Sequence, residues 1–285
     1  MINLIKKPQQ PQKKYLVFTS AGINSNLMHW LKGERNFDLW VSYYGDEDNK
    51  FKDNADYYIA KKGGKFPNFH YCYQKWNEII SHYDAVMIMD DDLIFSGSDI
   101  SQLFNTQQEL DLWLLQPAFD RRGKVSFSIT ETHAFSKLRY VNFVEVTCPL
   151  FQKGKLAEFM AIYDPILIGW GVDLWYSEIL SKQDTMHNKI AIIDEISCIN
   201  PRDKTKQNQL REIDKLQNTE TRQLVWQTIQ EKHNLDRKFK DKKQNYTQIN
   251  AKPTLSNILL GIKIKLIKLA YNCYKNIRSE KWRPS

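Results

Sequence analysis

The sequence predicts an α/β protein with a mostly parallel central sheet flanked by helices, and with a helical extension at the C-terminus. Two observations support this fold class. Short apolar runs alternate with amphipathic segments from residue 15 onward, in the order that a mostly parallel sheet requires. Residues 86–89 (VMIM) are apolar without interruption, which is typical of a strand that is buried on both faces.

The same patterns place the individual elements. The N-terminal half reads as strand, helix, strand, loop and strand, and a further helix leads into the apolar run. Strands are predicted over 15–19, 37–43, 57–59, 86–89, 112–116, 125–130, 141–147 and 189–194. Helices are predicted over 26–32, 69–81, 100–110, 155–162, 173–180 and 218–232.

We expect four segments along the chain. Residues 1–14 read as a flexible leader, and 15–204 as the α/β domain. Residues 205–250 are polar and charged and read as a solvated linker that contains one helix, and 251–285 as a basic amphipathic helix.

Charge is unevenly distributed along the chain. The net charge is +8, but residues 232–285 contain 14 Lys and Arg against 3 Asp and Glu, a local charge of +11 that leaves −3 for the rest. This distribution argues against a nucleic-acid-binding function for the protein as a whole. No apolar run approaches the roughly 20 residues that span a bilayer, and no signal peptide is recognisable. The 4 scattered cysteines indicate a reducing compartment, so we expect a cytoplasmic protein.

Three consecutive carboxylates, Asp90, Asp91 and Asp92, directly follow the apolar run at 86–89. Burying them unpaired would cost several kcal/mol, so a strand that delivers them to the carboxyl edge of the sheet suggests neutralisation by a divalent cation. Oxygen ligands of this kind favour Mg²⁺ or Mn²⁺ over zinc. The alternative is a solvated acidic turn.

Two further charged residues have open interpretations. Lys65 ends the loop KKGGK at 61–65, whose glycines and lysines could approach a phosphate or could form a basic surface turn. Glu145 interrupts the alternating segment 141–147 and is either the partner of a structural ion pair or a substrate ligand.

The segment GWGVD at 169–173 combines a tight loop with an aromatic ring and a carboxylate. Trp170 is placed to stack on a sugar, and Asp173 lies at the first turn of a helix, where free amides favour negative charge. Asp173 is therefore a candidate catalytic carboxylate, with a simple N-cap as the alternative.

Taken together, DDD at 90–92 after an apolar strand and GWGVD at 169–173 resemble the motifs of a nucleotide-sugar glycosyltransferase of the GT-A fold, a Rossmann-related architecture. The stretch VNFVEVTCPLF also resembles a poorly characterised family of GT-A-like proteins. The resemblance covers roughly residues 15–204. It implies transfer of a sugar from a nucleotide-sugar donor to a glycan or lipid-linked acceptor, as in surface polysaccharide or lipopolysaccharide synthesis.

The resemblance also implies roles for individual residues. Asp92 would bind Mn²⁺ or Mg²⁺, Asp90 would contact the ribose or the metal, and Asp91 would support them. Lys65 and Thr19 would contribute to donor binding, Trp170 and Glu145 to the sugar or acceptor, and Asp173 would be the general base of an inverting reaction.

The third metal ligand departs from the family pattern, which places a histidine late in the domain. The corresponding stretch here is CINPRDK and contains none. Asn200 or Asp203 could substitute, as could His133 or His187 from elsewhere in the chain.

Three other functions fit parts of the pattern. A retaining glycosyltransferase would use Asp173 to position the acceptor. A metal-dependent phosphohydrolase would use the DDD cluster, although a second carboxylate cluster for two metals is not evident. A nucleic-acid-binding protein would use the basic tail. The tail also carries an apolar stripe, however, and phosphate binding does not need such a stripe.

That stripe lies in residues 255–277, where apolar side chains recur at three- and four-residue spacing with lysines beside them. Such a helix suits an anionic membrane surface, and we expect peripheral attachment to the inner face of the membrane. The alternative is a helix that packs on its own domain or on another subunit.

Overall fold

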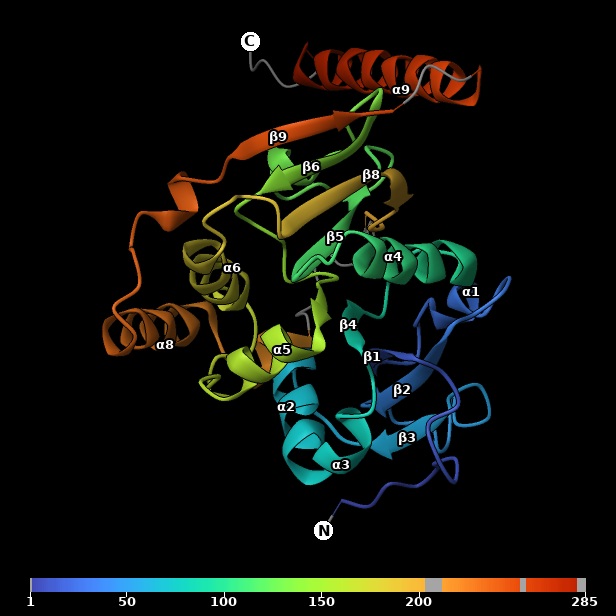
Figure 1. The fold of residues 1–285 in the computed structure, drawn as a ribbon, viewed down its shortest axis with the longest axis vertical. Helices are drawn as coiled ribbons and strands as arrows, with labels where there is room; N and C mark the ends of the chain where they lie inside the picture. Colours follow the sequence, from blue (N-terminus) through green and yellow to red (C-terminus); the bar gives the residue numbers. More distant parts are fainter. Residues whose placement is uncertain (1, 203–211, 252–254, 281–285) are drawn as a thin grey trace.

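The computed structural model describes residues 2–202, 212–251 and 255–280. A nine-stranded sheet in the order β3-β2-β1-β4-β7-β5-β8-β6-β9 runs through the described part of the chain (Figure 1). Its strands are β1 (Tyr15–Ala21), β2 (Phe37–Tyr43), β3 (Tyr57–Ala60), β4 (Ala85–Asp90), β5 (Leu114–Phe119), β6 (Ser136–Val141), β7 (Leu150–Gln152), β8 (Ile190–Cys198) and β9 (Asn245–Asn250).

The sheet is mixed, so the prediction of a mostly parallel sheet is only partly met. The strands β3, β2, β1 and β4 are all parallel, and so is the pair β5–β8. The pairs β4–β7, β5–β7, β6–β8 and β6–β9 are antiparallel. The short strand β7 lies between β4 and β5 and is antiparallel to both. The hydrophobic pattern of each strand alone does not tell which strand it pairs with, so it could not predict this strand order.

Helices cover both faces of the sheet. They are α1 (Leu27–Trp30), α2 (Lys65–Lys75), α3 (Asn77–Ile80), α4 (Gly97–Glu109), α5 (Lys153–Met160), α6 (Val172–Gln183), α7 (Glu212–Leu216), α8 (Thr219–Lys232) and α9 (Leu255–Glu280). One core lies between the sheet and α2, α5, α6 and α8, and a second lies between the sheet and α1 and α4 (Figure 1). The helix α9 lies beyond the edge strand β9 (Figure 1).

Two predicted strands, 125–130 and 141–147, are wrong. Residues 128–130 form a single 3₁₀ turn, and residues 142–147 form no strand. Backbone amides of this second segment bond to side chains instead of to a neighbouring strand: Val144 N donates to Ser177 Oγ (3.1 Å) and Glu145 N to Gln116 Oε1 (2.5 Å). Ser126, Glu145 and Thr147 of the two segments line a cavity, which accounts for part of the misleading alternation.

The predicted linker and leader are both packed on the domain. Trp226 and Ile229 of α8 are buried in the core, and β9 pairs with β6 as the last strand of the sheet. Near the N-terminus, Ile5 N donates to Tyr58 O (2.8 Å), which fastens the leader to β3. Within the described residues, no helix has the length and apolarity needed to cross a membrane.

Candidate active site

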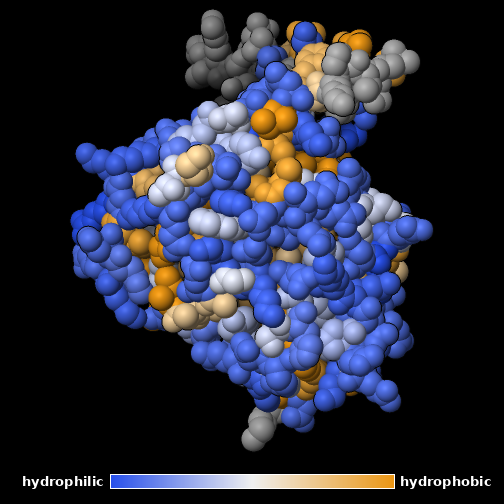
Figure 2. All heavy atoms as spheres, viewed as in Figure 1, coloured by the Kyte–Doolittle hydropathy of each residue, from blue (hydrophilic) through white to orange (hydrophobic). Residues whose placement is uncertain are grey.

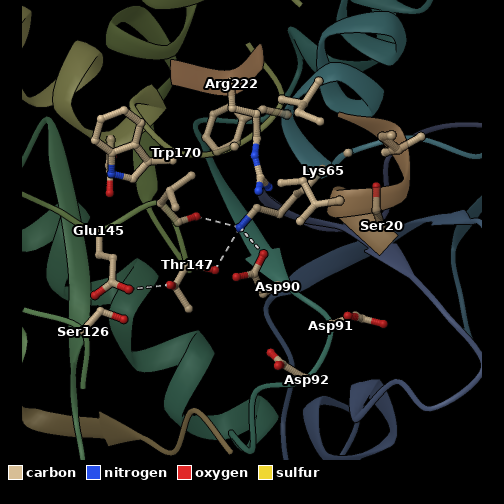
Figure 3. A pocket seen from close by; sticks show the side chains of 18 of the residues that line it. Ser20, Lys65, Asp90, Asp91, Asp92, Ser126, Glu145, Thr147, Trp170 and Arg222 are labelled. Atoms are coloured by element: carbon tan, nitrogen blue, oxygen red, sulfur yellow. Dashed lines mark hydrogen bonds and ion pairs between the residues drawn. The ribbon is translucent and has the colours of Figure 1, made fainter. Parts of the chain in front are cut away.

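A cavity of about 650 Å³ opens at the carboxyl ends of the parallel strands β1 and β4 (Figure 3). In open α/β sheets this edge is where ligands bind. The N-terminus of α2, the loop before α6, and α7 and α8 complete its walls. Its charged and aromatic lining includes Lys65, Asp90, Asp91, Asp92, Lys124, Glu145, Trp170, Asp173 and Arg222. The structure therefore brings most of the predicted site residues into one cavity.

The three aspartates leave the end of β4 in different directions. Asp90 points to Lys65, whereas the Asp91 side chain is directed away from it and accepts a hydrogen bond from Gly22 N (2.8 Å) (Figure 3). Among the described residues, no three His, Cys, Asp or Glu side chains form a group that could hold a metal ion by themselves.

Lys65 is a buried cation, so the interpretation of its loop as a basic surface turn is wrong for this residue. Its ammonium donates to Val146 O (2.6 Å) and Thr147 O (3.0 Å) and lies 2.7 Å from Asp90 Oδ1 (Figure 3). Only 9% of the side chain is exposed. The helix α2 begins at Lys65 because Gly64 precedes it in an extended conformation, and a Cβ at Gly64 would lie 2.9 Å from Ile168 O.

The loop before α6 presents Trp170 and buries Asp173. Trp170 is 45% exposed at the cavity, with its ring 6.1 Å from that of Trp226. Gly171 has φ of +100°, a conformation that favours glycine, and it is the N-cap residue of α6. Asp173 is therefore not the N-cap, although its Oδ1 accepts a hydrogen bond from Leu174 N (3.0 Å).

Burial raises the pKa of two of the carboxylates that line the cavity, Asp173 and Glu145. It raises the pKa of Asp173 to about 6, against the opposing effect of backbone amides that donate to the carboxylate. Burial, with the nearby charge of Asp173, raises the pKa of Glu145 to about 7. Glu145 accepts a hydrogen bond from Thr147 Oγ1 (2.9 Å) and has no ion-pair partner among the described residues. A group with a pKa near the working pH is suited to proton transfer.

Glu145→Gln is expected to stabilise the fold at pH 8. The pKa of Glu145 rises from 4.5 to about 7 on folding, so its favourable contribution is present below about pH 4.5 and is lost as the pH rises through about 7. The shift corresponds to about 3 kcal/mol, and the neutral amide should recover about 1–3 kcal/mol of this at pH 8. Urea unfolding at pH 4.5 and pH 8 measures the difference, with the exposed Glu109→Gln as control. A gain that is the same at both pH values would contradict the assignment.

Several predicted residues lie outside the cavity lining. Thr19 is fully buried and its hydroxyl donates to Met89 O (2.9 Å), whereas the next residue, Ser20, lines the cavity. Asn200 does not line the cavity, although its carbonyl accepts a hydrogen bond from Lys124 N (2.6 Å). His133 and His187 do not line it either, and Asp203 lies outside the described residues.

Arg222 of α8 is a cavity residue that the sequence did not indicate. Its guanidinium donates to Asp214 Oδ1 (2.6 Å), and 8% of the side chain is exposed. The spacing of Arg222, Trp226 and Ile229 on the predicted helix was the available signal, because it places all three on one face. Lys124 and Ser126 also line the cavity, and Ser126 belongs to the segment 125–130 that the sequence predicts as a strand.

No protein-family model matches the sequence, and no curated protein matches it. Among solved structures, residues 1–349 of TarS from S. aureus share 11% identity at a TM-score of 0.47, over 66% of this chain and 60% of that one. The same protein in complex with UDP-GlcNAc shares 11% identity at a TM-score of 0.44, over 88% of this chain and 79% of that one. GalNAc-T7 with UDP, GalNAc and Mn²⁺ shares 9% identity at a TM-score of 0.48, over 78% of this chain and 55% of that one. The chain thus spans less than two thirds of the first of these structures.

Proposed function

We propose that the protein is a glycosyltransferase that takes a sugar from a nucleotide-sugar donor. The observation that carries this proposal is the composition of one cavity. Its lining combines acidic residues at a strand end, the buried ammonium of Lys65, the exposed ring of Trp170 and the buried carboxylate of Asp173. These are the groups needed to hold a diphosphate, stack on a sugar and accept a proton.

The charge of the cavity supports a divalent cation as part of this function. Among the residues that the structure describes, the lining contains five carboxylates (Asp90, Asp91, Asp92, Glu145 and Asp173) against three cations (Lys65, Lys124 and Arg222). A diphosphate would add further negative charge, so a cation that enters with it offsets the repulsion. Mg²⁺ is commonly held by one or two carboxylates together with substrate phosphates, a donor set that Asp92 and Asp90 fit. The ion would stabilise charge on the leaving diphosphate.

The side chains of the protein account for the remaining steps. Trp170 stacks on a sugar of the donor or of the acceptor, and the ammonium of Lys65 lies where it can meet the diphosphate. As the acceptor hydroxyl forms its bond to the anomeric carbon, the bond from that carbon to the diphosphate breaks. Asp173 takes the proton of the hydroxyl, so that the product is the extended acceptor and a nucleoside diphosphate. This order of events describes an inverting transferase.

Experiments can distinguish two alternative enzyme activities from this proposal. A retaining transferase would use the same cavity with Asp173 as a positioning residue, and the anomeric configuration of the product separates the two. A phosphohydrolase would release inorganic phosphate. Incubation with a panel of nucleotide sugars and Mn²⁺, followed by identification of the released sugar and nucleotide, tests the proposal directly. Release of inorganic phosphate alone would overturn it.

Asp92→Asn is expected to abolish metal-dependent binding of a nucleoside diphosphate while the fold persists. The carboxylate loses the charge that a divalent cation needs, whereas an amide oxygen keeps its size. Titration calorimetry with UDP in the presence and absence of Mn²⁺ measures the effect. The matched control is Asp46→Asn, whose side chain is 92% exposed and lies outside the cavity lining. Equal UDP affinity in Asp92→Asn and the parent protein would remove Asp92 from the metal site.

The acceptor within this proposal is a glycan or a lipid-linked molecule at the cytoplasmic face of a membrane, as in the synthesis of surface polysaccharide or lipopolysaccharide. An exposed aromatic ring at the mouth of the cavity suits a sugar acceptor. Turnover with an oligosaccharide as acceptor, compared with hydrolysis of the donor alone, tests this part separately.

A further inference from the structure

The helix α9 (Leu255–Glu280) has two apolar sides, and only one of them packs against the rest of the protein. The inner side contacts the domain. Gly261 is buried, and a Cβ at this position would lie 2.3 Å from the ring of Phe135. The Tyr271 ring lies 4.7 Å from the guanidinium carbon of Arg202. Ile264 and Ile267 face a small cavity of about 80 Å³ that Asp120, Thr132 and Ser197 also line.

The outer side carries five large apolar residues that remain exposed to solvent. Their exposed fractions run from 41% to 61%: Ile258 41%, Leu259 58%, Ile262 48%, Leu266 60% and Leu269 61%. At 3.6 residues per turn, these positions fall within one sector of the helix, opposite Ile264, Ile267 and Tyr271. We call these five residues the outer stripe. A band of hydrophobic atoms runs up to this end of the molecule (Figure 2).

The charges beside the outer stripe favour one kind of binding partner. Lys263 and Lys265 are exposed and fall on either side of the stripe, with Lys263 also bordering the small cavity on the inner side. The chain from residue 232 onward has a charge of +11. Two copies that met through this face would bring like charges together. An anionic lipid surface would instead pair the ammonium groups with headgroups and receive the apolar side chains.

We propose that the outer stripe of α9 docks the protein on an anionic membrane surface and does so in a fixed orientation. The sequence alone allowed a helix on a flexible linker, whereas the structure shows one fastened to the domain. The strand β9 is hydrogen-bonded along β6, and Ala251 N donates to Phe135 O (2.8 Å) shortly before α9 begins. Because the inner side packs on the domain, the helix presents the outer stripe away from it. Among the described side chains of α9, none lines the candidate active site.

Flotation with lipid vesicles tests this proposal without relying on catalysis. The full chain is mixed with vesicles of phosphatidylcholine alone or with phosphatidylglycerol, at low salt and at about 0.5 M salt, where exposed charges are largely screened. We expect binding to the anionic vesicles that weakens with salt but persists in part. Leu259→Glu combined with Leu266→Glu should lower the apparent affinity about tenfold or more, because carboxylates replace inserted side chains near anionic lipid.

The matched control is Met186→Glu, which changes a 78% exposed apolar residue away from α9 and should bind as the parent protein does. Cys273 is the exposed thiol of the chain while Cys72, Cys148 and Cys198 are buried, so an environment-sensitive dye on Cys273 reports insertion. Unchanged flotation of the double variant, or no binding by the parent protein, overturns the proposal. Loss of self-association by the double variant, measured by sedimentation velocity, would assign the stripe to a subunit interface instead.

Discussion

Asp173→Asn is expected to lower kcat by about 10²–10⁴-fold, the range found for positioned acid–base groups, with donor affinity nearly unchanged. The reason is chemical, because an amide cannot accept the proton of the acceptor hydroxyl. The local structure should survive, since the amide oxygen of asparagine can still accept the hydrogen bond from Leu174 N that Asp173 Oδ1 accepts (3.0 Å). Stopped assays of product formation give kcat, and calorimetry with the donor gives affinity.

Glu178→Gln provides the matched control on the same helix. Glu178 is 2% exposed, as Asp173 is 3% exposed, but it does not line the cavity and pairs with Lys182. A general loss of helix stability would lower the rate in both variants, whereas loss of a base lowers it only in Asp173→Asn. Near-normal turnover of Asp173→Asn would leave this carboxylate with a structural role alone.

The pH profile of the parent protein gives an independent readout of the same group. A general base must be ionised, and burial raises the pKa of Asp173 to about 6. We therefore expect kcat/KM to fall below about pH 6 and to rise above it, and we expect this limb to be absent from the residual activity of Asp173→Asn. An acid limb that persists in Asp173→Asn would assign the titration to another group, with Glu145 the first candidate.

The features that could be predicted from the sequence are those that depend on neighbouring residues. The apolar run at 86–89 requires a buried strand, and the carboxylates directly after it then reach the sheet edge, as β4 and Asp90 show. GWGVD likewise predicts a tight loop followed by a helix, because the glycines and the subsequent apolar spacing are local signals. The structure places both motifs on the same cavity.

The features that could not be predicted depend on residues far apart in the chain. The sequence left Lys65 open between a phosphate-binding loop and a surface turn. The carbonyls of Val146 and Thr147 and the carboxylate of Asp90, which make its burial possible, come from distant parts of the chain. Residues 205–250 read as a charged linker, because the buried side chains of the described part, 212–250, are few and widely spaced. The burial of Trp226 and the pairing of β9 with β6 follow from tertiary structure, not from local propensity.

Arg139→Met is expected to destabilise the fold by about 3–5 kcal/mol, the cost of leaving one member of a buried ion pair without its partner. Arg139 and Asp194 join β6 to β8, and neither side chain is exposed at all. The pair is bidentate, with Nε–Oδ2 at 2.8 Å and Nη2–Oδ1 at 3.0 Å. The guanidinium also donates to Ile129 O (2.7 Å), close to the Ser126 wall of the cavity.

Urea unfolding of two further variants separates the ion pair from the loss of a large side chain. Lys189→Met breaks an exposed ion pair, in which the Lys189 side chain is 27% and the Asp111 side chain 66% exposed. This change should cost less than about 1 kcal/mol, because solvent screens such pairs. Arg139→Met combined with Asp194→Leu should be more stable than Arg139→Met alone, because it removes the orphaned charge as well. If both Arg139 variants lose the same amount, removing the orphaned charge brings no net gain. The cost then comes from the hydrogen bonds of this network, which join Arg139 to Ile129 O and Glu131 O and His133 N to Asp194 Oδ1.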